Sequence, residues 1–176
     1  MSPRHLAVLL PLLCATVMTA SCEARTPSPH PAMKPSITYL HLLRNTPFFT
    51  ALTTAQLRHV IDHSREWEVS AGAPILGNVT AEGRDDVWVL LDGGWELHYR
   101  GQVLRSGHAD AGKWFSAASL GPEAFELVAN EHSYVMQIPA QDMDAMLAQG
   151  FDFTPHLDAG RALYRRLRDS TRPLTP

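Results

Sequence analysis

The sequence predicts a mainly β protein with flanking helices, built as a double-sheet jelly roll. Apolar and polar residues alternate in short segments between residues 67 and 138, and glycine-containing turns separate several of them. Helical periodicity appears before and after this region. Many short strands at close spacing are typical of a jelly roll or barrel rather than of a parallel sheet.

One helix is expected before the strands. Thr53 and Gln56 are spaced as a capping box, and Leu57, Val60 and Ile61 give one apolar face to a helix that ends near residue 64. Strands are then expected at residues 67–69, 74–76, 87–91, 95–99, 102–104, 113–115, 125–128 and 134–138. The turns at residues 71–72, 92–94 and 100–101 punctuate them, and the last two are expected to be tight hairpins.

Two helices are expected after Pro139, one over residues 141–149 and closed by Gly150, the other beginning at Thr154. Along the second helix, apolar or small residues recur at steps of four and three: Phe153, Leu157, Gly160, Tyr164 and Leu167. This spacing is that of a coiled-coil seam. The seam either packs on the domain's own sheet or pairs with a second copy as a homodimer.

The N-terminal 21 residues are predicted to be an export signal. They begin weakly basic, continue through an apolar run at residues 6–18 and end in small residues before Cys22. The run is too short for a bilayer, which needs about 20 residues. The segment TASC at 19–22 resembles the bacterial lipobox, which predicts that Cys22 is lipidated and holds the protein on the periplasmic face of the envelope. Cleavage after Ala20 or Ala24, giving a soluble periplasmic protein, is the alternative.

Residues 22–36 carry prolines at 27, 29, 31 and 35 and are expected to form a stiff, solvated tether. Residues 37–169 are long enough for one domain with its own core, and residues 170–176 are expected to be a tail. Losing residues 1–21 removes Arg4 and no acidic residue, so the formal net charge changes from −3 to −4. This charge argues against nonspecific binding of nucleic acid or anionic lipid.

Candidate catalytic and metal sites are few. The only cysteines are Cys14 and Cys22, so the mature domain has none for a disulfide, a zinc site or a thiol nucleophile. His59 and His63 lie at i, i+4, but a solvated helix face explains them better than a metal site. The pairs at 85–86 and at 142 and 144 are better explained by a hairpin tip and a helix N-terminus than by acid–base dyads. The sequence therefore predicts no enzyme, no metal and no cofactor.

Several segments at matching separations resemble the cyclic nucleotide-binding domain of the catabolite activator and protein kinase A regulatory subunits. They are PFFTAL at 47–52, QL at 56–57, VSAG at 69–72 with Ile75, VWVLLDGGWEL at 87–97, GKWF at 112–115 and VMQIP at 135–139. The resemblance runs from about residue 39 to residue 167. It implies a β-roll with a phosphate-binding cassette between two of its strands.

The family's cassette reads Phe-Gly-Glu-Leu-Ala, then a short helix, then Pro-Arg-x-Ala, and its Glu and Arg hold the ribose hydroxyl and the cyclic phosphate. The matching residues here are Phe115, Ser116 and Ala117, followed after a shorter link by Pro122, Glu123 and Ala124. Ala117 stands for the Glu and Glu123 for the Arg, so both ligand-holding side chains are absent.

The sequence therefore predicts a noncatalytic binding or assembly module of the envelope, with a protein partner and without a cyclic nucleotide. The alternative is a periplasmic sensor whose roll binds a small ligand, either a cyclic nucleotide or another molecule. A deep pocket bordered by Tyr99, Ala117 and Glu123 would favour the sensor.

Overall fold

The computed structural model describes residues 33–77 and 83–170. The predicted export signal, Cys22 and most of the predicted tether and tail lie outside these residues. The elements are, in chain order, β1 (Met33–Ser36), α1 (Leu40–Asn45), the 3-10 helix η1 (Pro47–Phe49), α2 (Thr54–Asp62), β2 (Arg65–Val69), β3 (Pro74–Gly77), β4 (Val87–Asp92), β5 (Gly94–Tyr99), β6 (Gln102–Gly107), β7 (Trp114–Phe115), the 3-10 helix η2 (Ala117–Ser119), β8 (Phe125–Ala129), β9 (Ser133–Ile138), α3 (Ala140–Ala148) and α4 (Thr154–Ser170).

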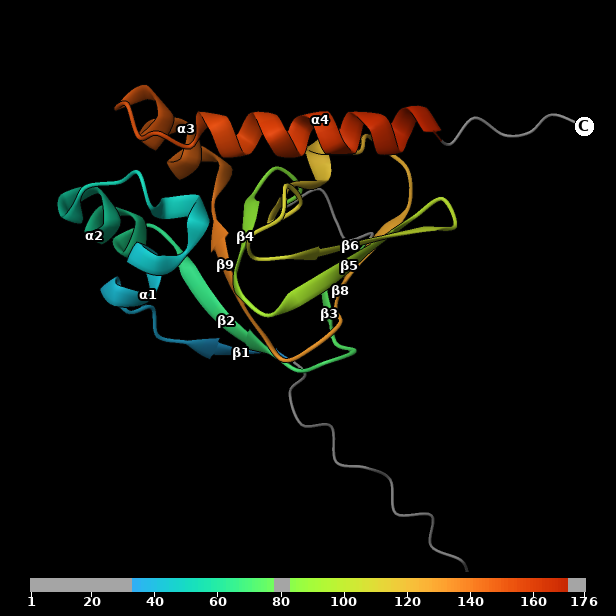
Figure 1. Cartoon of the computed structure of the whole chain (residues 1–176), viewed down its shortest axis with the longest axis horizontal. Coiled ribbons are helices and arrows are strands. Elements are labelled where there is room, and N and C mark those ends of the chain that lie inside the picture. The colour runs from blue at the N-terminus through green and yellow to red at the C-terminus, as the bar shows by residue number, and fades with distance from the viewer. Residues whose placement is uncertain (1–32, 78–82, 171–176) are drawn as a thin grey trace, which may run out of the picture.

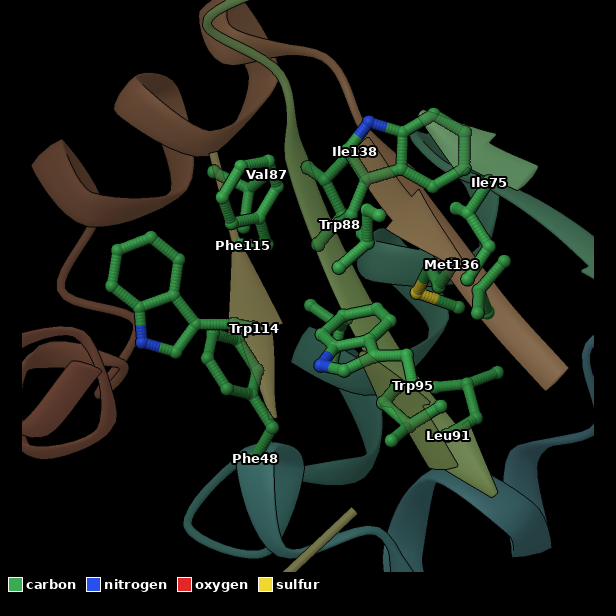
Figure 2. Packing of buried hydrophobic residues seen from close by; sticks show 14 of the residues in the cluster. Phe48, Ile75, Val87, Trp88, Leu91, Trp95, Trp114, Phe115, Met136 and Ile138 are labelled. Carbon is green, nitrogen blue, oxygen red and sulfur yellow. The ribbon is translucent and has the colours of Figure 1, made fainter. Parts of the chain in front are cut away.

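The strands form two antiparallel sheets, which confirms the predicted double-sheet roll with flanking helices (Figure 1). The five-stranded sheet has the order β1-β2-β9-β4-β7, and the four-stranded sheet has the order β3-β8-β5-β6. Apolar side chains from both sheets and from the helices make one core. Figure 2 shows part of it around strand β4.

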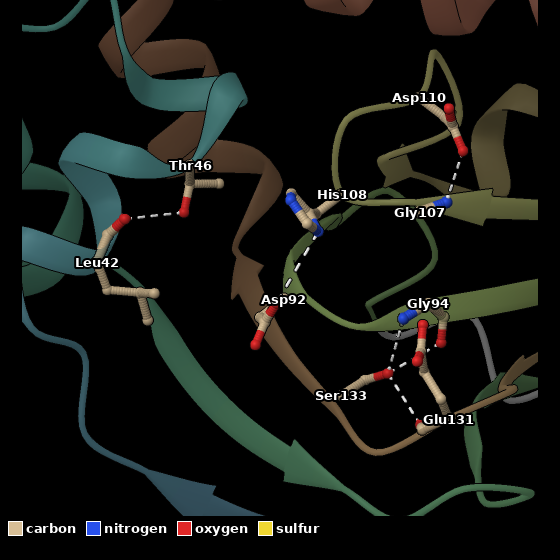
Figure 3. A network of polar contacts seen from close by, with 9 residues as sticks. All are labelled: Leu42, Thr46, Asp92, Gly94, Gly107, His108, Asp110, Glu131 and Ser133. Atoms are coloured by element: carbon tan, nitrogen blue, oxygen red, sulfur yellow. Dashed lines mark hydrogen bonds and ion pairs between the residues drawn. The ribbon is translucent and has the colours of Figure 1, made fainter.

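One of the two predicted hairpins is correct and the other is wrong. Tyr99 pairs with Gln102 across Arg100 and Gly101, whose φ angles of 49° and 75° are those of a two-residue hairpin loop. Residues 92–94 instead carry the chain from one sheet to the other, because β4 and β5 belong to different sheets. The Ser133 hydroxyl holds this corner by accepting from the Gly94 N–H at 3.1 Å and contacting the Gly94 carbonyl at 2.9 Å (Figure 3).

The end of the predicted tether is also corrected. Residues 33–36 form edge strand β1, in which Met33 pairs with Val69 and Ser36 with Glu66. Proline favours a solvated tether in a sequence, but it is tolerated in an edge strand, where one side of the backbone needs no ladder partner. Lys34 adds an ion pair to Glu68 at 2.9 Å.

The predicted N-terminal helix is α2. Its Thr53 hydroxyl accepts from the Gln56 N–H at 3.3 Å, and the Gln56 side chain accepts from the Thr53 N–H at 2.9 Å, which confirms the capping box. Sequence analysis did not predict α1 and η1. Phe48 of η1 stacks on Phe153, so these N-terminal helices meet the link between α3 and α4.

The C-terminal helices were predicted to within one residue at each start. Helix α4 runs across one end of the roll (Figure 1). All five predicted seam residues are buried within this one chain. These residues therefore pack on the domain itself, which is the first of the two alternatives for the seam. In residues 33–77 and 83–170, no helix is long and apolar enough to cross a bilayer.

Three of the four tryptophans, Trp88, Trp95 and Trp114, are buried. Simple alternation along one strand could not place both Trp88 and Trp95 in a core. The structure resolves this conflict because the two residues lie on strands of different sheets. Trp67 of β2 is partly buried.

Candidate functional site

The segment that corresponds to the cassette begins at the end of β7 and is closed over by protein. Phe115 and Ala117 have no exposed surface. The Phe115 ring contacts the rings of Phe125 and Tyr164, with centroids 5.3 and 5.7 Å apart. The first half of the cassette is therefore part of the hydrophobic core.

The loop just before β4 fastens the cassette from the outside. The Ser116 hydroxyl donates to the Asp85 carbonyl at 3.2 Å. In return, the Arg84 guanidinium donates to the Gly121 carbonyl at 2.7 Å. Asp86, next in this loop, accepts from the Ala140 N–H at 3.0 Å and so caps helix α3. The prediction that residues 85 and 86 form a hairpin tip is wrong, because β3 and β4, which flank this loop, belong to different sheets.

Glu123 takes the place of the missing arginine and already has two partners. Its carboxylate forms an ion pair with Arg100 and accepts from the Tyr99 hydroxyl at 2.9 Å. The hairpin places both partners, because Tyr99 ends β5 and Arg100 is the first loop residue. Arg100 also lies over the Tyr99 ring, 5.3 Å from its centroid. The negative charge of Glu123 is thus neutralised within the domain.

Tyr99, Ala117 and Glu123 do not together border the deep pocket that would have favoured the sensor. Tyr99 and Ala124 do line an open hollow of about 300 Å³ beside the hairpin, but Ala117 and Glu123 do not line it. Ala117 is fully buried and has no polar side-chain atom to offer. Of the predicted site residues, the structure brings Glu123 and Ala124 next to the hairpin. It places Phe115, Ser116 and Ala117 in or against the core.

Helix α4 packs tightly on the cassette. The Trp114 indole N–H donates to the His156 carbonyl at 2.9 Å, and the Tyr164 hydroxyl donates to the Trp114 carbonyl. Burial raises the pKa of Tyr164, so this phenol stays protonated. Gly160 lies against the Trp114 indole so closely that any Cβ at this position would overlap the ring.

A groove of about 460 Å³ lies between the cassette and helices α3 and α4. Arg161, Arg165 and Arg168 line one wall of it, at helical spacing on α4. Arg161 is also paired with Asp158 at 3.2 Å. Asp85 and Asp144 lie on the other side, and apolar residues such as Leu147 line the groove between α3 and the cassette. The sequence pattern alone did not place these arginines beside the cassette.

The histidine pair predicted to lie on a solvated helix face does not make a metal site. The His59 and His63 rings are 4.2 Å apart, and His63 Nδ1 lies 3.1 Å from the Asp142 carboxylate. Among residues 33–77 and 83–170, no three histidine, cysteine or acidic side chains gather closely enough to hold a metal ion.

Comparison with known proteins gives structural matches only. No protein-family model and no curated protein matches the sequence. A Geobacter metallireducens GS-15 protein assigned to the cyclic nucleotide-binding class is 24% identical, with a TM-score of 0.53 over 75% of this chain and 98% of the other. A protein kinase A regulatory domain with Sp-2Cl-cAMPS bound is 16% identical, with a TM-score of 0.55 over 75% and 88% of the two chains.

The sensor domain of the transcriptional regulator DNR from Pseudomonas aeruginosa is also similar, at 16% identity and a TM-score of 0.51, over 78% of this chain and 100% of the other. Identities of this size carry information on the fold and not on the ligand. Domains of this fold are typically noncatalytic binding modules. Two sheets in this order, the flanking helices and these matches together show that the chain has the cyclic nucleotide-binding domain fold.

Proposed function

We propose that this protein is a noncatalytic binding module, exported and lipid-anchored at Cys22, that does not recognise cyclic nucleotides. The observation that carries the proposal is the state of Glu123. A carboxylate stands where the fold's phosphate-binding arginine is expected, and Arg100 and Tyr99 already hold it.

A cyclic nucleotide would lose both of its expected charged contacts in this cassette. Ala117 offers no acceptor to a ribose hydroxyl, and Glu123, already paired with Arg100, offers no positive charge to a phosphate. Charge-assisted contacts of this kind contribute roughly 1.5–3 kcal/mol each. Since about 1.4 kcal/mol is a factor of ten, losing two of them lowers affinity by orders of magnitude.

Calorimetry with cyclic AMP, cyclic GMP and cyclic dinucleotides tests this part of the proposal. We expect no heat at millimolar ligand, which corresponds to binding no better than about −4 kcal/mol. The double variant Ala117→Glu with Glu123→Arg restores the two side chains but not the shortened link, and serves as the comparison. Micromolar binding of cyclic AMP by the wild type would contradict the proposal.

The groove beside the cassette is the surface that we assign to a protein partner. Its wall of arginines on α4 favours a segment with acidic side chains, and Arg165 has no ion-pair partner among the described residues. Arginine forks pair with carboxylates bidentately. An acidic segment of an envelope protein, laid along α4, would meet three guanidinium groups within about two helical turns.

Helix α4 supplies a matched control for this surface. Arg165 lines the groove, whereas Arg166 is the next residue, is exposed and does not line it. We expect an oligo-glutamate peptide to bind the wild type and Arg166→Glu similarly, to bind Arg165→Glu more weakly, and to lose affinity as salt is raised. Equal binding by the two variants would mean that the groove is not the docking surface.

Fractionation tests the anchor separately. Cys22→Ser should move the protein from the membrane fraction to the soluble periplasm, and mass spectrometry of the wild type should find lipid on its N-terminus. Membrane association of the serine variant, together with an unmodified wild-type N-terminus, would contradict lipidation.

A further inference from the structure

A second hollow lies away from the cassette, where β1 ends, α2 ends and β2 begins. It measures about 490 Å³. The residues that line it come from these three segments: Ser36, Ile37, Thr38, Ile61, Ser64, Arg65, Glu66 and Trp67. None of them belongs to the cassette or to the arginine groove.

Three residues that line this hollow each carry a buried polar atom without a partner among the described residues. Ser64 Oγ, Glu66 Oε2 and Trp67 Nε1 are buried and have no hydrogen-bond partner among the residues that the structure describes. Buried polar groups in native proteins are nearly always hydrogen-bonded, and an exception calls for a specific explanation. All three residues line the hollow, so a molecule bound there could supply the missing partners once these side chains turn toward it.

The charge of Glu66 decides what kind of molecule this is. Its side chain belongs to a residue only 4% exposed, and an unpaired buried carboxylate is strongly destabilising. The nearest cations of the sheet are committed elsewhere, since Lys34 and His132 both lie at Glu68, 2.9 and 3.5 Å from its carboxylate oxygens. Arg65 is exposed, so water screens its charge more than it screens that of Glu66.

The rest of the lining is apolar on one side. Ile37 is 70% exposed and Ile61 is partly buried, and both line the hollow. A ligand for this hollow therefore needs a positively charged hydrogen-bond donor and a short apolar body. We propose that the hollow binds a small organic ammonium compound, with the ammonium group on Glu66 and the apolar body against Ile37 and Ile61.

Three probes of the same length separate charge from apolar contact: n-butylammonium, n-butanol and butanoate, each at roughly 10 mM to suit millimolar affinity. A ligand that binds only the folded state raises the melting temperature. We expect n-butylammonium to raise the melting temperature of the wild type more than an equal concentration of KCl does. The other two probes should leave the melting temperature unchanged.

Variants then assign the effect to this hollow. Glu66→Gln should melt at a higher temperature than the wild type without ligand, because it removes an unpaired buried charge, and should lose the shift with n-butylammonium. Glu68→Gln, two residues along the same strand, should keep the shift. Ile37→Ser, which changes an exposed side chain and should leave the fold intact, should reduce it.

Three results would overturn the proposal. One is an equal shift with n-butylammonium and n-butanol. Another is a full n-butylammonium shift in Glu66→Gln or no shift in the wild type. The third is a Glu66→Gln variant that melts below the wild type, since that would mean that the carboxylate has a structural partner within the chain. None of these results depends on whether the cassette binds nucleotides.

Discussion

Glu123 and Glu66 are two carboxylates in opposite situations. The Glu123 side chain is 37% exposed, where water alone could solvate it, yet it has both Arg100 and Tyr99 as partners. Glu66 is buried, where a partner is needed most, and its Oε2 has none among the described residues. The charge of Glu123 is thus balanced within the domain, whereas the buried carboxylate oxygen of Glu66 has no partner among the described residues.

The comparison shows that the place where a ligand motif has been altered need not be the place where a ligand is now needed. The cassette departs from the motif of its fold, but its charges are balanced and its first half is core. The hollow at Glu66 corresponds to no motif in the sequence, and only its unpartnered atoms identify it. A search for function in a divergent domain should therefore follow unpaired buried groups as well as aligned positions.

The largest expected effect on stability concerns the packing of helix α4 against Trp114 at the start of the cassette. Gly160→Val should destabilise the domain by about 3 kcal/mol, because the added side chain overlaps the buried Trp114 indole and overpacking of this kind has few ways to relax. Urea denaturation measures the change. Ala159→Val, at the neighbouring exposed position on α4, controls for the lower helix propensity of valine and should cost less than about 1 kcal/mol. Similar losses in both variants would show that α4 is loosely held on the cassette.

A smaller effect tests the two glutamates directly. Tyr99→Phe removes the hydroxyl that Glu123 accepts from and should cost about 1 kcal/mol, the usual net contribution of one hydrogen bond. Glu66→Gln should change stability in the opposite direction. Equilibrium denaturation of both variants at the same pH gives the two signs. If both variants are destabilised, the contrast between the two carboxylates is wrong.

The smallest effect is a dependence on pH. Burial, followed by the nearby charge of Lys113, lowers the pKa of His156 below its ordinary value of 6.5. The unfolded chain therefore binds this proton more readily than the folded domain, so stability is full above pH 6.5 and falls as the pH drops below it. The urea midpoint of His156→Gln should fall less between pH 7.5 and pH 5.5 than that of the wild type. An equal fall would assign the acid sensitivity to other groups.

Local signals in the sequence predicted most of the fold. The capping box at Thr53 and the hairpin at Arg100 and Gly101 each depend on a few neighbouring residues, and both are present. The turn at residues 92–94 was misassigned because the same residue types serve a hairpin and a switch between sheets, and only the pairing of distant strands distinguishes the two. Strand β1 was missed because its proline obscured the pattern of an edge strand.

The candidate site was less predictable. The identities of Ala117 and Glu123 could be read from the chain, but the partners of Glu123 come from a hairpin more than 20 residues earlier. Glu66 alternates with Trp67 and Val69, which were expected to face inward, so the pattern gave no indication that the glutamate is buried as well. Burial on both sides of a strand depends on which helices cover it, and the alternation within one strand does not report this.

The pairing of Ser36 with Glu66 gives strand β1 a thermodynamic link to the hollow. Ser36 is the last residue of the strand and also lines the hollow, so a molecule bound there gains contacts only while β1 remains paired with β2. By linkage, whatever detaches β1 must weaken binding, and a bound molecule must oppose detachment by the same free energy. If the proposed anchor at Cys22 holds the protein, tension along the chain would reach the domain at β1 first, and the proposed ligand would then raise the force that this strand withstands.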